Sequence, residues 1–235
     1  NPATRELWKY PDTGQWDPDR NSKEFADAMP VWRGHGLNAF SLNLQGGSPT
    51  GYGNKDWINS GFDRLGGLRN DYFKRLDHIL RTADELGMVV VLGLFYFGQD
   101  QHLLGEFSVL RAIDNTIDWL FNAGYRNVLI EVNNECDQGS YDHSMLRPEQ
   151  ISKLIKRIQL KEKGGLRFLV STSFTGNTIP NRDVIGASDF ILLHGNGVER
   201  PERISEMVAE VRKSPGYRPK PANMLTLLPK AYLTQ

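Results

Sequence analysis

The fold of this chain is decided by the stretch Arg126–Asp137, which reads RNVLIEVNNECD. Its apolar residues are Val128, Leu129, Ile130 and Val132. An apolar run of this length is typical of a parallel strand that is buried on both faces. Amides and a carboxylate follow the run abruptly, and the carboxyl ends of parallel strands are where α/β folds place their chemistry. We therefore predict a buried strand with a polar cluster at its end, and Glu135 as the candidate proton donor.

Other apolar runs alternate with helical patterns along the chain. We predict further strands at 37–44, 88–97, 166–174 and 189–197, and a weak one at 221–228. Helices are predicted from a capping box of Asn21 and Glu24 up to Gly34, and at 70–86, 104–122, 148–161 and 201–213. This alternation indicates a parallel α/β protein, and the polar strand ends favour a barrel over a doubly wound sheet. The predicted fold is an incomplete (β/α)8 TIM-like barrel of about five to six parallel strands, where a closed barrel needs eight.

Composition excludes several classes of function. The 235 residues carry 28 basic and 28 acidic side chains, so charge gives no reason to expect a nucleic acid or an anionic membrane as partner. The single cysteine, Cys136, excludes an internal disulfide. The five histidines show no metal-ligand spacing, and no strand is followed by a nucleotide-binding glycine motif, so we expect no metal and no cofactor.

The chain is expected to form one partial barrel domain over 1–235. Residues 1–20 form an irregular N-terminal segment, and 222–235 an atypical C-terminal tail. No segment has the roughly 20 consecutive apolar residues of a membrane helix, and the first residues do not resemble a signal peptide. The sequence therefore predicts a soluble chain and leaves its compartment undetermined.

Glu131, Asn134 and Glu135 form an E-x-x-N-E pattern at the end of the central strand. This pattern resembles the end of the fourth strand in the large clan of retaining (β/α)8 glycoside hydrolases, which contains many cellulases, mannanases and β-galactosidases. His194 ends a later predicted strand, as a histidine does in the sixth strand of that clan. The resemblance covers Phe25 to about Pro221, aligned to strands two to six.

The resemblance implies a role for each matching position. Glu135 would be the general acid/base, which protonates the departing glycosidic oxygen and later deprotonates the attacking water. Asn134 would bind the sugar 2-hydroxyl, and His194 would lie along the cleft and bind the substrate or the nucleophile. Alternation along the strand places Glu131 on the same side as Glu135 but deeper, in a buried polar network.

The sequence departs from the family pattern in three places. Cys136 stands where proline is common, and Ser41–Asn43 stand where arginine is common near the end of strand two. No Asp or Glu follows Glu210, so the family's nucleophile position is vacant. A truncation, a rearrangement or an altered reading frame after Pro221 would each explain this. The candidates for a second carboxylate are Asp100, Asp137 and Asp142.

Several candidates also have a simpler structural interpretation. Glu135 could cap a helix or pair with a cation, and His194 could be a hydrogen-bonded core residue. Asn43, Trp57 and Tyr96 complete the predicted substrate-binding set; Trp57 is the better candidate for stacking on sugar, and Tyr96 could instead pack against helices.

Two hypotheses for the function remain open. The first is a glycoside hydrolase that acts on β-linked glycosides or glycans through Glu135 and a second carboxylate. The second is a catalytically defective relative that binds carbohydrate or persists only as a folded remnant. Because an open barrel leaves strand edges unpaired, we also expect either that the terminal segments cover the gap or that a homodimer forms through the edges.

Overall fold

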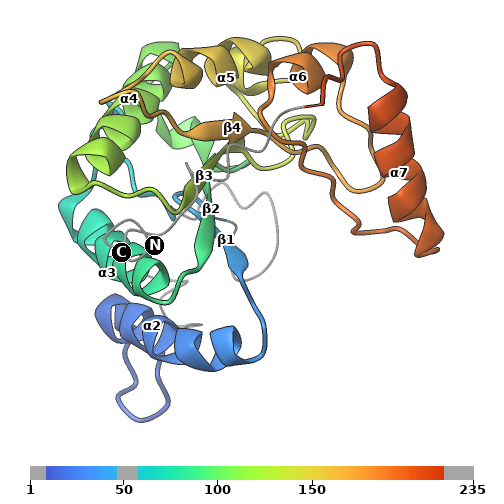
Figure 1. Ribbon diagram of the computed structural model, residues 1–235. Helices are drawn as coiled ribbons and strands as arrows, with labels where there is room; N and C mark the ends of the chain where they lie inside the picture. The colour runs from blue at the N-terminus through green and yellow to red at the C-terminus, as the bar shows by residue number, and fades with distance from the viewer. Residues whose placement is uncertain (1–8, 47–57, 220–235) are drawn as a thin grey trace.

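The computed structural model describes residues 9–46 and 58–219 and has an α/β architecture (Figure 1). Its strands are β1 (Ala39–Asn43), β2 (Val89–Phe95), β3 (Val128–Asn133) and β4 (Leu169–Ser171). Its α-helices are α2 (Pro18–Gly34), α3 (Asn70–Glu85), α4 (Glu106–Ala123), α5 (Ile151–Gln159), α6 (Arg182–Ala187) and α7 (Glu202–Lys213). Two short 3-10 helices are η2 (Asp100–His102) and η3 (Ser144–Leu146).

The four strands form one parallel sheet in the order β1-β2-β3-β4. The register aligns Asn43 of β1 with Gly93 of β2, Gly93 with Glu131 of β3, and Glu131 with Ser171 of β4. Residues in register on neighbouring strands point to the same face of a sheet. One layer of the sheet therefore carries an amide, a glycine, a carboxyl group and a hydroxyl group side by side.

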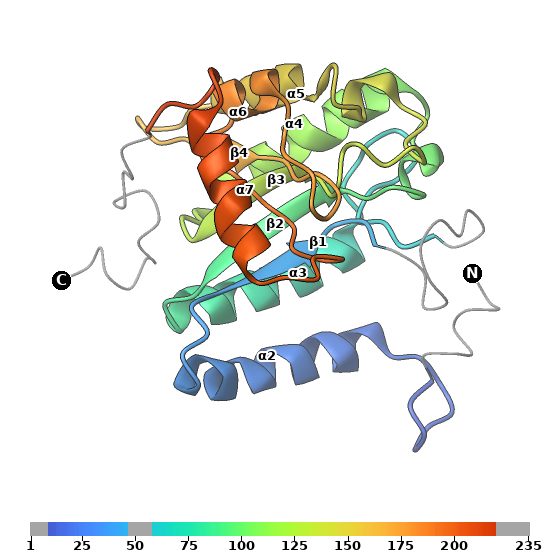
Figure 2. The ribbon, with the colours of Figure 1, turned by 90° about the vertical axis from the view of Figure 1, so that its right-hand side faces the viewer.

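The helices follow one another in an arc around the strands, from α2 to α7 (Figure 1). In the turned view, α3 and α2 lie on the same side of the sheet (Figure 2): α3 packs against β2 and against α2, and α2 reaches β1 through Phe25, whose ring centroid lies 5.5 Å from that of Phe40. The apolar face of α3 is buried through Phe73, Leu76, Leu80 and Ala83. The amphipathic spacing of these residues explains why this predicted helix forms over almost its expected range.

The first helix begins earlier than predicted. α2 starts at Pro18, and the Asp17 carboxylate caps it by accepting the backbone N–H groups of Asp19 and Arg20 at 3.0 and 2.9 Å. The predicted capping box at Asn21 and Glu24 is therefore wrong. An Asp followed by Pro is itself a strong helix start, because it combines a side-chain acceptor with a first-turn residue that needs no N–H partner.

The predicted strand at 189–197 does not form. The backbone N–H of Asp189 donates to the Val170 carbonyl at 2.8 Å, and the Asp189 carboxylate accepts the Val170 N–H at 3.0 Å. One residue thus takes both hydrogen-bonding groups that Val170 would offer to a fifth strand. Arg167 and Gln159 hold the same carboxylate, so the sheet of the described residues ends at β4.

The described residues contain four parallel strands and no closed barrel, fewer than the five to six strands predicted. The predicted strand at 221–228 and the candidate Trp57 lie outside the described residues. Within the described ranges β1 and β4 are the two edges of the sheet, and the pairing of two chains through them stays a prediction. None of the helices in those ranges is long and apolar enough to cross a membrane.

Candidate functional site

Glu135 lies two residues beyond β3, in a left-handed backbone conformation with φ of 50°. Such a conformation costs a residue with a side chain roughly 1–2 kcal/mol, so the surrounding structure must hold it. The Glu135 N–H donates to Ser173 Oγ at 2.8 Å, and the Cys136 N–H donates to the Ser173 carbonyl at 2.9 Å. Ser173, just after β4, therefore holds the turn with both its side chain and its backbone.

The Glu135 carboxylate meets side chains from two separate segments. His194 Nδ1 lies 3.0 Å from Glu135 Oε1, and Asn196 Nδ2 donates to the same oxygen at 3.3 Å. Gln138 Nε2 donates to the other oxygen at 3.3 Å. Glu135 is only 8% exposed. His194 thus contacts Glu135, and it does so from an irregular segment instead of the strand end at which it was predicted.

Glu131 lies beneath this cluster and is buried, as expected from its place in the strand. Ser173 Oγ donates to Glu131 Oε1 at 2.5 Å. Burial raises the pKa of Glu131; the negative charge of Glu135 acts in the same direction, while the Ser173 hydrogen bond and His194 oppose it. The two glutamates and His194 therefore form one electrostatic group.

Asn134 is partly exposed, and its backbone is fixed from both sides. Its N–H donates to the Phe95 carbonyl at 3.0 Å, and its own carbonyl accepts the Tyr141 hydroxyl at 2.6 Å. Its side-chain amide has no hydrogen-bond partner within the described part of the chain. Asn134 is thus a positioned amide beside Glu135 that is free to bind a ligand.

The three candidate second carboxylates have different surroundings. Both oxygens of Asp137 are used by Thr175, through its N–H and its hydroxyl, each at 2.7 Å. Asp100 is fully buried, and its Oδ2 accepts the backbone N–H groups of Asp142 and His143. The Asp142 side chain is exposed and makes no hydrogen bond within the described residues. Asp142 is therefore the one of the three whose carboxylate is not already engaged.

The remaining candidates lie apart from Glu135 or are enclosed. Asn43 ends β1, with its Oδ1 buried above Gly93. Tyr96 is 9% exposed and packs on Phe97 with ring centroids 4.5 Å apart, which matches the simpler interpretation that it packs in the core. Cys136 is buried, and burial raises the pKa of its thiol, which disfavours a thiolate nucleophile.

Sequence reasoning missed three members of this site. Ser173 follows β4, Gln138 lies three residues after Glu135, and Asn196 lies two residues after His194. The sequence feature that could have identified these residues is that small and amide residues follow each apolar run. Nothing in the order of residues indicated that Ser173 would hold the backbone of Glu135, since 38 residues separate them.

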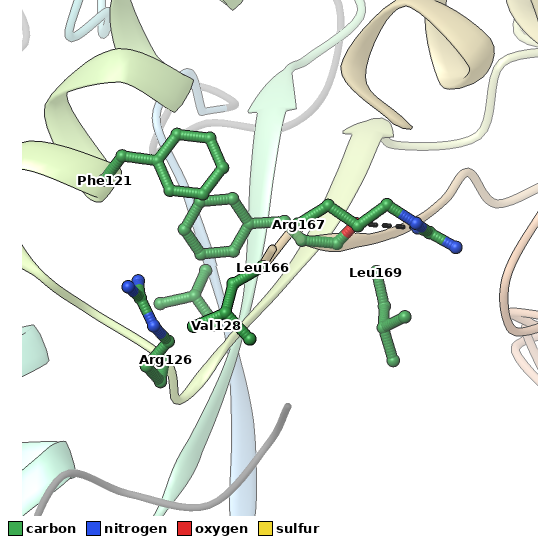
Figure 3. Close-up of a pocket in the computed structure, with 7 residues that line it drawn as sticks. Phe121, Arg126, Val128, Leu166, Arg167 and Leu169 are labelled. Carbon is green, nitrogen blue, oxygen red and sulfur yellow. Dashed lines mark hydrogen bonds between the residues drawn. The ribbon is translucent and has the colours of Figure 1, made fainter. Parts of the chain in front are cut away.

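Two cavities lie away from Glu135. One is at the opposite ends of β3 and β4, lined by Phe121, Arg126, Val128, Leu166, Arg167, Phe168 and Leu169 (Figure 3). Its volume of about 10 Å³ is at the lower limit for one water molecule. The other, of about 270 Å³, lies between α6, the segment 188–193 and α7. The described residues contain no group of three His, Cys, Asp or Glu side chains that could hold a metal ion.

Comparison with known proteins finds solved structures that are similar to part of this chain. No family model matches the chain, and no curated protein matches it in sequence. A glycoside hydrolase family 5 enzyme from Prevotella bryantii B14 is 13% identical, with 74% of this chain and 51% of that chain covered and a TM-score of 0.44. A family 5 mannosidase from Rhizomucor miehei is 16% identical, with 78% and 52% covered and a TM-score of 0.41.

A further similar structure is beta-glucosidase 2 from Trichoderma reesei, at 16% identity and a TM-score of 0.41, with 66% of this chain and 37% of that chain covered. The chain thus spans about half the length of the two family 5 enzymes and less of the third. The three solved structures are a glycoside hydrolase family 5 enzyme, a family 5 mannosidase and a beta-glucosidase, and similarity at this level assigns this chain neither a family nor an activity.

Proposed function

We propose that this chain is a glycoside hydrolase that acts on β-linked glycosides or glycans, with Glu135 as the general acid/base. The observation that carries the proposal is the convergence of His194, Asn196 and Gln138 on the carboxylate of Glu135, next to the amide of Asn134, which has no hydrogen-bond partner among the described residues. A buried carboxyl group with side-chain partners, at the end of a parallel strand, is suited to proton transfer to a ligand.

In this mechanism Glu135 protonates the glycosidic oxygen as the bond breaks and then deprotonates the attacking water. His194 Nδ1 contacts Oε1 of Glu135, so it orients the carboxyl group. The Asn134 amide would hydrogen-bond a sugar hydroxyl beside the reacting carbon, an interaction that strengthens as positive charge develops on the sugar ring.

Glycoside hydrolysis needs a second carboxyl group. Its distance from the first is about 5 to 5.5 Å for retention and about 6.5 to 9.5 Å for inversion. Among the three candidates we favour Asp142, because the carboxylates of Asp100 and Asp137 already accept hydrogen bonds that hold neighbouring backbone. Recruiting either of those two would require breaking these contacts.

The same contacts favour an alternative function, in which the chain binds carbohydrate without hydrolysing it. If neither Asp100 nor Asp137 is released and Asp142 lies too far from the sugar, Glu135 has no partner for the reaction. Asn134, His194 and Asn196 would then serve only as hydrogen-bonding groups for sugar hydroxyls.

Release of nitrophenol from a panel of aryl β-glycosides tests the proposal. The wild type is compared with Glu135→Gln, with Asp100→Asn, Asp137→Asn and Asp142→Asn, and with the exposed control Glu149→Gln. We expect turnover that is abolished by Glu135→Gln and by Asp142→Asn and is unchanged in the control. Turnover that survives Glu135→Gln would refute the site. No turnover on any sugar, together with saturable oligosaccharide binding, would support the alternative.

A further inference from the structure

Two oxygen atoms border the same small space above Gly93. A Cβ atom added at Gly93 would lie 2.0 Å from Asn43 Oδ1 and 3.6 Å from Glu131 Oε2. Gly93 has no side chain, so Asn43 Oδ1 occupies the space that a Cβ atom would take, and Glu131 Oε2 borders the same space. Both residues belong to the layer that runs in register across the sheet.

Asn43 Oδ1 is buried and has no hydrogen-bond partner within the described residues. A buried acceptor without a donor costs about 1–3 kcal/mol, so such an atom calls for an explanation. A carboxylate oxygen beside it supplies no donor, whereas a protonated carboxyl group supplies one O–H.

The other oxygen of Glu131 already has its donor. Ser173 Oγ accepts the Glu135 N–H and directs its single proton to Glu131 Oε1. A proton on Glu131 Oε2 would complete the series: Glu135 N–H to Ser173 Oγ, Ser173 O–H to Glu131 Oε1, and Glu131 O–H to Asn43 Oδ1. Every donor and acceptor in the series would then be used once.

We propose that Glu131 is held as a neutral carboxylic acid that donates to Asn43 Oδ1 and, through Ser173, positions the backbone of Glu135. A neutral Glu131 adds no negative charge next to Glu135, so Glu135 can take up and release a proton without a second charge beside it. The raised pKa of Glu131 agrees with this assignment. Glu131 is a positioning residue, and its importance for turnover rests on the proposed function, whereas its protonation does not.

Among the described residues, the titratable groups that interact with Glu131 are Glu135, His194 and Tyr141. Glu135 repels a negative charge on Glu131, and His194, from the segment after β4, attracts it. A negative charge on Glu131 would also act on the pKa of the Tyr141 hydroxyl. The neighbours on β1, β2 and β4 in the same layer are Asn43, Gly93 and Ser171, which do not titrate in the working range. Of these groups, Glu135 is the one that raises the pKa of Glu131, so replacing it with Gln should lower the pKa of Glu131.

Carboxyl ¹³C NMR of glutamate-labelled protein tests the proton directly, with signals assigned through Glu131→Gln and Glu135→Gln. At pH 6 an ordinary glutamate, with a pKa near 4.3, is almost fully ionised. We expect the Glu131 signal to remain at the carboxylic-acid position at pH 6, and its titration to shift to lower pH in Glu135→Gln. An ionised Glu131 at pH 6 would overturn the proposal and would mean that the Asn43 amide is rotated to donate its NH₂ to a carboxylate.

The positioning role has its own readout, the hydrogen exchange of the Glu135 amide. Ser173→Ala should speed this exchange at least tenfold, Ser173→Thr should preserve slow exchange, and the buried control Ser171→Ala should leave it unchanged. Equal exchange in Ser173→Ala and wild type, in folded samples, would refute the positioning role. Neither readout uses turnover, so a protein without glycosidase activity would refute the proposed function and leave this inference to be decided by the NMR data.

Discussion

Asp100 and Glu135 are both buried carboxylates beyond the ends of neighbouring strands, yet they are held in opposite ways. The partners of Asp100 include two backbone N–H groups, of Asp142 and His143, as well as the His143 ring at 3.0 Å. The partners of Glu135 are side chains only, while Ser173 separately holds its backbone. A carboxylate bound to backbone fixes a loop. A carboxylate bound to side chains can exchange those partners for a ligand while the fold stays intact.

The comparison is tested most strongly by Glu135→Gln. This change keeps the shape of the side chain and removes the proton that is transferred, so we expect the rate of glycoside hydrolysis to fall about 10²- to 10⁴-fold. The free energy of unfolding should change by less than about 1 kcal/mol, because no backbone group loses its partner. Steady-state kinetics and urea unfolding of the same samples measure both quantities. A loss of stability without a loss of rate would make Glu135 a scaffold residue.

Asp100→Asn should show the reverse pattern. The three contacts of Asp100 all end on Oδ2, so the amide loses the negative charge that holds them and puts an NH₂ group in the place of the buried Oδ1, which weakens the anchor of the loop that begins at Asp142. We expect the free energy of unfolding to fall by about 3 kcal/mol, measured by urea denaturation. The control is Asp114→Asn, which breaks a partly exposed ion pair with Arg157 and should cost less than about 1 kcal/mol. Equal effects of the two variants would contradict the assignment of Asp100 as an anchor.

Gly93→Ala examines the layer that supports Glu135. The added methyl group would meet Asn43 Oδ1 at 2.0 Å, so either β1 or the amide must move. We expect a loss of about 1–3 kcal/mol in thermal or urea unfolding, partly restored in the double variant with Asn43→Ala. Gly139→Ala is the matched control, because a Cβ there meets nothing within 4 Å. No restoration in the double variant would show that the two residues do not share this space.

The smallest expected effect is a pH dependence that arises from His143. Its hydrogen bond to Asp100 raises the pKa of His143, so the protonated ring stabilises the folded state. That stabilisation is fully present below the unfolded pKa near 6.5 and is lost as the pH rises through the higher folded value. The destabilisation caused by His143→Gln should therefore be larger at pH 5.5 than at pH 8.5. The difference should vanish in an Asp100→Asn background, and its persistence there would exclude Asp100 as the cause.

Local pattern was sufficient to predict β2, β3 and α3, but not α6, for which no helix was predicted from the sequence. The apolar runs at Val89–Phe95 and Val128–Asn133 and the amphipathic spacing of Asn70–Glu85 depend on neighbours close in sequence, and the structure has them as strands and a helix. The strand predicted at 189–197 fails because its first residue, Asp189, uses its side chain to occupy the edge of β4. An apolar run does not reveal that a side chain will compete with the backbone for a ladder position.

The candidate site likewise contains residues that the sequence could predict and residues that it could not. Glu135 was expected at a strand end and lies just beyond β3, whereas His194 meets it from an irregular segment and not from the strand that the sequence predicted. The roles of Ser173 and Asn43 were not predictable, since they depend on the register of four strands and on a glycine that leaves room between two of them. Such contacts join residues far apart in the chain and leave no periodic signal.

The most direct test of the central claim is an NMR titration of the wild-type chain with a panel of β-linked tetrasaccharides. The claim is that the cluster around Glu135 binds sugar and that the Asp100 anchor does not. It predicts saturable shifts of the Asn134, Glu135 and His194 signals, with the signals of Asp100 and His143 almost unmoved. Shifts confined to the cavity between α6 and α7, or no shifts at millimolar sugar, would contradict it.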